Sequence, residues 1–76
     1  MQIEKKVKEI ILDIIDENNL KKIDISQITN STPITDFGFD SLNMAQLTVK
    51  IEAEFEVDIF EEKIIRTFGE IIEEIK

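Results

Sequence analysis

The apolar residues near the start of the chain recur every three to four positions. They are Ile3, Val7, Ile10, Ile11, Ile14 and Ile15. A helix of 3.6 residues per turn gathers such positions on one face, so the spacing predicts an amphipathic helix over about residues 2–17. Asn18 and Asn19 follow, and asparagine tolerates the left-handed backbone with which many helices end. Nothing in the chain alternates with period two for long enough to make a sheet, so the sequence predicts an all-α fold.

Residues 20–40 show no sustained period. Turn-forming residues are concentrated here, namely Ser26, Thr29, Asn30, Ser31, Thr32, Pro33, Thr35 and Gly38. Apolar residues that could pin the segment across a core are interspersed among them, namely Leu20, Ile23, Ile25, Ile28, Ile34 and Phe37. A connection this long in a compact domain is either functional or held by its own side chains. We therefore expect a long ordered loop.

A second helix is predicted from Asp40, a preferred N-cap residue, to about Glu56. At 100° per residue one face becomes the predicted core face, which holds Met44, Leu47, Thr48, Ile51 and Phe55. A second apolar stripe lies roughly opposite, with Leu42, Ala45, Val49 and Ala53, joined by Gln46 and flanked by Glu52 and Glu56. The second stripe has no core left to enter, which predicts a surface for a partner.

The C-terminal part of the chain contains a capping box, with Thr67 as N-cap and Glu70 three residues later, which predicts a last helix over about residues 68–75. Gly69 should weaken this helix by up to about 1 kcal/mol relative to alanine. Residues 61–65 are expected to form only one or two turns. The predicted architecture is a small helical bundle with three principal helices, one short helix and a long ordered loop, forming a single domain over residues 1–76.

The chain of 76 residues contains no cysteine and no histidine. Disulfides, thiolate zinc sites and a histidine general base are therefore unavailable, and catalysis by this chain alone is not expected. Acidic residues outnumber basic ones 17 to 9, for a net charge of −8. Nucleic acid and anionic membranes should be repelled. No apolar run reaches the roughly 18 residues of a membrane span, and no signal-peptide core follows Met1, so a cytoplasmic location is predicted.

The negative charge is concentrated in residues 36–62, which hold eight acidic residues and the single base Lys50, and so −7 of the net −8. This charge coincides with the second apolar stripe, where it would steer a basic partner. Ser41 lies directly after the N-cap Asp40, at a helix end that favours a bound anion such as a phosphate ester. Position alone does not distinguish this role from the common one in which Asp-Ser only caps a helix.

The segment from Asp36 to Leu42 and the acidic helix after it resemble the acyl carrier protein family. The resemblance covers the whole chain: first helix, long loop, Gly-x-Asp-Ser-Leu motif, acidic helix, short third helix and last helix. It implies that a phosphopantetheinyl transferase attaches 4′-phosphopantetheine from coenzyme A to Ser41, and that Asp40 helps to hold the magnesium used in that step. It also implies a monomer that docks on enzymes with basic patches through Leu42, Ala45 and Val49, with Glu52 and Glu56 as acidic neighbours.

Three positions depart from the pattern of fatty-acid carriers. Asn43 and Gln46 stand where those carriers usually have acidic residues, and Lys50 adds a cation to the second helix. The resemblance thus implies a carrier of acyl intermediates as thioesters, in fatty-acid, polyketide or related synthesis, while an aminoacyl or peptidyl carrier of a specialised pathway remains open. A non-covalent acidic adaptor, with Ser41 only as a cap, is a third possibility. The sequence does not identify the cargo.

Overall fold

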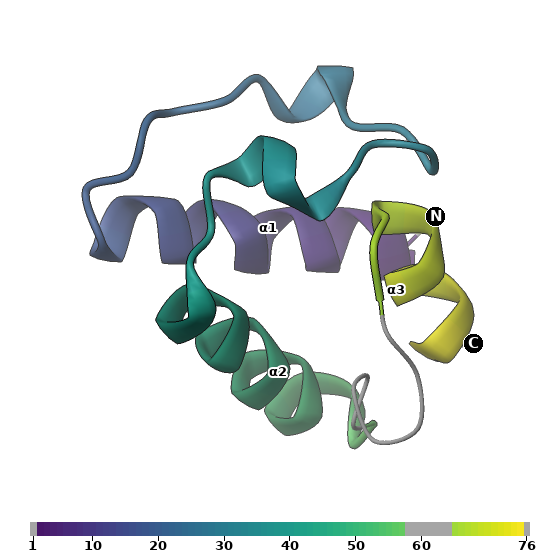
Figure 1. Cartoon of the computed structure of the whole chain (residues 1–76). Helices are drawn as coiled ribbons and strands as arrows, with labels where there is room; N and C mark the ends of the chain where they lie inside the picture. The colour runs from purple at the N-terminus through teal and green to yellow at the C-terminus, as the bar shows by residue number, and fades with distance from the viewer. Residues whose placement is uncertain (1, 58–64, 76) are drawn as a thin grey trace.

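The fold was analysed in a computed structural model that describes residues 2–57 and 65–75. Its elements, in chain order, are α1 (Gln2–Glu17), the 3₁₀ turns η1 (Ile25–Gln27) and η2 (Ile34–Phe37), α2 (Ser41–Phe55) and α3 (Phe68–Ile75). Helix α2 runs back at an oblique angle to α1, α3 lies beside the N-terminal end of α1, and the long loop arches over the other side of α1 (Figure 1). Within the described residues there is no strand, so the all-α prediction is confirmed.

Helix α1 forms where the apolar stripe predicts it. Its buried side chains are Val7, Ile10, Ile11, Ile14 and Ile15. After Glu17 the backbone turns left-handed at Asn19, whose φ is 54°. The Leu20 N–H then donates to the Ile15 carbonyl over 2.9 Å, which is the six-to-one hydrogen bond of a Schellman motif. The two asparagines thus end the helix as the sequence indicates.

The long connection between α1 and α2 is ordered, as predicted. Ile28, Ile34 and Phe37 are buried in the common core. Leu20, Ile23 and Ile25 pack against the same core with part of their surface exposed. Two 3₁₀ turns provide hydrogen-bond partners for part of the loop backbone. Asp24 caps the first turn by accepting a hydrogen bond from the Ser26 N–H. The loop is therefore a layer of the fold that covers α1.

Backbone hydrogen bonds tie this loop to the start of α3. The Ile34 N–H donates to the Arg66 carbonyl over 2.8 Å, and the Phe68 N–H donates to the Thr32 carbonyl over 2.9 Å. The Gly69 N–H donates to the Asn30 carbonyl over 2.8 Å. These bonds surround an isolated antiparallel bridge between Pro33 and Thr67. Two segments far apart in sequence thus hold each other without forming a sheet.

Gly69 lies in this contact, which explains why the helix accepts a residue of low helix propensity here. A Cβ atom at Gly69 would lie 2.6 Å from the Asn30 carbonyl oxygen and 2.9 Å from the Asn30 Cβ, closer than packed atoms approach. The predicted cap is present, because Thr67 Oγ1 accepts from the Glu70 N–H over 3.2 Å. The Glu70 carboxylate accepts from the Arg66 N–H, one residue before the expected partner. Glycine here serves tertiary packing at the expense of helix propensity.

The buried face of α2 differs in direction from the predicted core face. Leu47 and Ile51 are fully buried as expected, but Asn43 is only 3% exposed, whereas Met44 and Phe55 are half-buried. On a 100° wheel the centre of burial is rotated by about 60°, toward Leu47. The reason is that α1 covers the side of α2 on which Asn43 lies.

The short helix predicted within residues 61–65 lies, apart from Ile65, outside the described residues.

Candidate functional site

The N-terminus of α2 is closed by two reciprocal hydrogen bonds. Asp40 Oδ1 accepts from the Asn43 N–H over 2.9 Å, and Asn43 Oδ1 accepts from the Asp40 N–H over 3.0 Å. Asp40 is therefore the N-cap, as predicted, and Asn43 fills the role that a longer Glu or Gln usually has in a capping box. The second carboxylate oxygen of Asp40 takes no part in this cap, and the residue as a whole is exposed.

Ser41 is the first residue of α2 and is exposed. The described residues offer its hydroxyl no hydrogen-bond partner. An open hollow of about 430 Å³ beside it is lined by Ser41, Met44, Ala45 and Thr48. Because the cap uses the N–H groups of Asp40 and Asn43, those of Ser41 and Leu42 still point out of the helix end. The hydroxyl is thus accessible at the positive end of a 15-residue helix.

The turn before Asp40 fixes where α2 begins. Gly38 has a φ of 74°, in the left-handed region that favours glycine, and it ends η2. On one side of it Phe37 is buried, and on the other Phe39 packs partly against the core. Their rings lie 5.6 Å apart at an angle of 58°. Two anchored aromatic residues around one glycine therefore hold the loop that leads to Ser41.

The predicted partner face is exposed. Leu42 and Val49 are 63% and 65% exposed, and they are the two large hydrophobic residues exposed in the described part of the chain. Ala45, Glu52 and Glu56 are also exposed. Glu56 additionally forms the C-cap of α2 with a left-handed backbone. We refer to the side of α2 formed by Leu42, Ala45, Val49, Glu52, Ala53 and Glu56 as the outer face.

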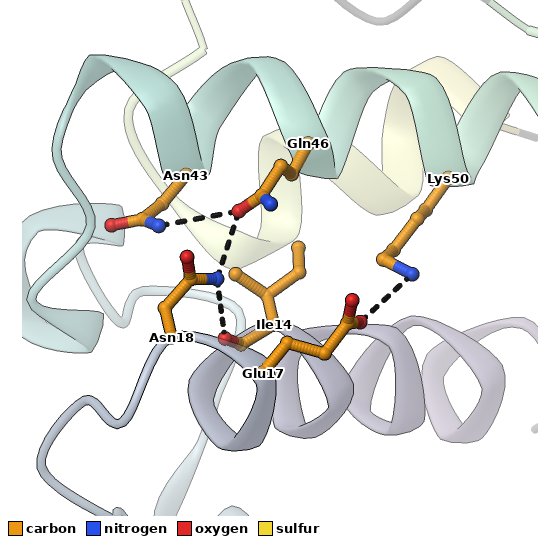
Figure 2. A network of polar contacts seen from close by, with 6 residues as sticks. All are labelled: Ile14, Glu17, Asn18, Asn43, Gln46 and Lys50. Carbon is orange, nitrogen blue, oxygen red and sulfur yellow. Dashed lines mark hydrogen bonds and ion pairs between the residues drawn. The ribbon is translucent and has the colours of Figure 1, made fainter.

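Gln46, which the sequence assigns to the same face, points instead toward α1. Its Oε1 accepts hydrogen bonds from Asn18 Nδ2 over 2.9 Å and from Asn43 Nδ2 over 3.3 Å (Figure 2). Asn18 Nδ2 also donates to the Ile14 carbonyl at the end of α1. Four residues further along α2, Lys50 Nζ lies 3.0 Å from Glu17 Oε1. Gln46 is therefore half-buried, at the edge of the outer face.

All three departures from the fatty-acid carrier pattern take part in this polar network: Gln46 and Lys50 contact the C-terminal end of α1 directly, and Asn43 joins it through Gln46. The sequence predictions gave their partners, Glu17 at the end of α1 and Asn18 directly after it, no role beyond those of a helix residue and a turn residue. The three-residue spacing of Asp40 and Asn43 is a local signal from which the capping box could have been predicted. No local pattern indicates the contact between Asn18 and Gln46, which lie 28 positions apart.

A family model described as the phosphopantetheine attachment site matches residues 5–75. The chain therefore belongs to the family of carrier proteins that bear covalently attached 4′-phosphopantetheine, in agreement with its resemblance to acyl carrier proteins. The comparison with solved structures found no match for this chain. Carriers of this family are modified by phosphopantetheinyl transferases and interact with partner enzymes.

The structure around the N-terminus of α2 fits a phosphopantetheine group. An accessible hydroxyl, two outward N–H groups and an uncapped carboxylate oxygen lie within one turn. Once attached, the group supplies a terminal thiol on a long flexible arm.

Among residues 2–57 and 65–75 no three His, Cys, Asp or Glu side chains cluster as metal ligands. No helix in these ranges is long and apolar enough to span a membrane.

Proposed function

We propose that Ser41 is the attachment residue and that the protein carries acyl intermediates as thioesters on its phosphopantetheine arm. The observation that carries this proposal is the exposed, unbonded hydroxyl of Ser41 at the capped start of α2. In the attachment reaction Ser41 Oγ forms a bond to the phosphorus of the phosphopantetheine phosphate. The hydroxyl loses its proton, and adenosine 3′,5′-bisphosphate leaves coenzyme A. Asp40, through its free oxygen, contributes a ligand to the magnesium ion of the transferase.

The chain supplies no catalytic group of its own in this proposal. It is a single domain, a monomer and a cytoplasmic protein, loaded and processed by other enzymes. The outer face is where those enzymes dock, with Leu42, Ala45 and Val49 as apolar contacts and Glu52 and Glu56 as acidic neighbours. Gln46 contributes at the margin of this face, and its main hydrogen bonds are internal.

The test is intact mass after incubation with coenzyme A and a broad-specificity phosphopantetheinyl transferase. We expect a gain of one phosphopantetheine by the parent protein and none by Ser41→Ala. Ser31→Ala is the matched control, because Ser31 is also exposed and lies outside the helix terminus, and it should load like the parent. The free energy of unfolding of Ser41→Ala should lie within about 0.5 kcal/mol of that of the parent, since an exposed residue at a helix start contributes little packing.

Loss of loading in Ser31→Ala, or loading of Ser41→Ala, would contradict the assignment of Ser41. If the parent gains no mass under conditions in which a known carrier is fully modified, the non-covalent adaptor is favoured instead.

An aminoacyl or peptidyl cargo is the second candidate. It is favoured by the reduced acidity of α2, where Asn43 and Gln46 replace the usual carboxylates and Lys50 adds a cation. The two cargoes can be separated by offering the phosphopantetheinylated protein to an amino-acid adenylating enzyme and, separately, to an acyl-transferring enzyme encoded near it. The thioester that forms identifies the class.

A further inference from the structure

Val49 stands between two open hollows on the surface of α2. The first, of about 530 Å³, is lined by Val49, Glu52, Ala53 and Glu56. The second, of about 320 Å³, is lined by Glu17, Ala45, Gln46, Val49 and Lys50. We call them the acidic hollow and the balanced hollow. Because Val49 is exposed and has a depression on either side, it forms an apolar ridge against which a partner can pack.

Within residues 2–57 and 65–75, nothing neutralises the charge of the acidic hollow. Glu52 and Glu56 are exposed, and no lysine or arginine nitrogen of the described residues lies within 4.0 Å of either carboxylate. Two neighbouring carboxylates beside an apolar ridge attract a partner surface that carries basic side chains.

The balanced hollow has a carboxylate and a cation that cancel each other. Glu17 from α1 and Lys50 from α2 pair over 3.0 Å at its rim (Figure 2). Gln46 adds no charge, and its Oε1 already accepts two hydrogen bonds. The side chains of Lys50 and Glu17 are 34% and 53% exposed, and ion pairs with such exposure contribute little to folding stability. The main effect of Lys50 is therefore on the charge that a docking partner meets.

We propose that the outer face binds a partner enzyme whose basic side chains meet only the acidic hollow, and whose side chain over the balanced hollow is uncharged and apolar. In this arrangement Lys50 is a specificity-determining residue. It neutralises Glu17 and disfavours partners that present a basic group on the α1 side of Val49. The inference rests on the proposed function, and it adds the charge pattern that a partner must have.

Two single substitutions test the role of this ion pair. Lys50→Gln and Glu17→Gln break the same contact, but the first leaves the balanced hollow negative and the second leaves it positive. The probe is attachment of phosphopantetheine by a broad-specificity transferase with a basic docking surface, which represents the partners that Lys50 disfavours. We expect the apparent KM to fall about threefold for Lys50→Gln and to rise about threefold for Glu17→Gln, with kcat unchanged. Both shifts should vanish near 1 M salt, where charges are screened within about 3 Å.

Lys22→Gln is the matched control. Lys22 pairs with Asp16 over 3.3 Å, lines neither hollow and, when substituted, changes the net charge as Lys50→Gln does. Its KM should equal that of the parent. Equal shifts in the same direction for Lys50→Gln and Glu17→Gln would show a structural role, and unchanged KM in both would show that partners do not contact this hollow. Either result overturns the inference while loading at Ser41 still stands, whereas failure of the parent to load removes the proposed function itself.

Discussion

The two faces of α2 are made of similar apolar residues in opposite environments. Leu47 and Ile51 on the inner face are fully buried, while Leu42 and Val49 on the outer face are 63% and 65% exposed. Burial in this helix is therefore decided by which side α1 covers and not by residue type. An apolar side chain that folding leaves uncovered is available for binding. The inner face holds the domain together, and the exposed outer face is the proposed docking surface.

The largest expected effect is on the inner face. Leu47→Ala removes a fully buried side chain between α1 and α2 and should lower the free energy of unfolding by about 2–5 kcal/mol. Leu42→Ala makes the same chemical change on the outer face and should lie within about 0.5 kcal/mol of the parent. Denaturant unfolding of both variants measures the contrast. Similar losses for the two leucines would mean that the faces are not distinct in the way described.

The next effect concerns the polar residue within the inner face. Asn43→Ala removes two partly buried hydrogen bonds, one from the Asp40 N–H and one of the two that Gln46 Oε1 accepts, which should cost about 1 kcal/mol. Ser41→Ala, two residues away and exposed, is the control and should change little. Thermal melting distinguishes them. A parent-like melting temperature for Asn43→Ala would show that solvent replaces these bonds at no cost.

The smallest effect on stability is expected at the ridge of the outer face. Val49→Asn should change the unfolding free energy by no more than about 0.5 kcal/mol, because valine and asparagine have similar helix propensities and the site is exposed. Attachment of phosphopantetheine should nevertheless slow severalfold. Val7→Asn, at a fully buried position in α1, is the opposite control and should unfold the protein. Unchanged attachment by Val49→Asn would place docking elsewhere.

Features set by local spacing were predictable from the sequence. The 3.6-residue period predicted α1, the turn residues predicted the left-handed end at Asn19, and Asp40 and Thr67 predicted two helix starts. The pairing of an acidic helix with an exposed apolar stripe predicted the outer face. These signals are readable because a cap or a helical face depends on residues within a few positions of one another.

Features set by contacts distant in sequence were not predictable. The rotation of the buried face toward Asn43 depends on where α1 lies, and the orientation of Gln46 depends on Asn18 at the end of another helix. Gly69 stood out in the sequence only as a residue of low helix propensity. Its close approach to Asn30, which explains why glycine is needed, belongs to the tertiary fold and has no local signal. A helical wheel gives the angle between residues, but it gives no information on which neighbour covers them.

The pairing of residues 30–34 with residues 66–69 has a consequence for the order in which the chain folds during synthesis. The segment that leads into the serine is closed by backbone hydrogen bonds to Arg66, Phe68 and Gly69, which the ribosome adds late. A nascent chain that ends before residue 66 lacks all three bonds, even though the whole loop, the serine and α2 are already made. The last helix therefore completes the backbone hydrogen bonds of this loop, and an unfinished chain presents the serine from a loop held only by its contacts with earlier parts of the chain.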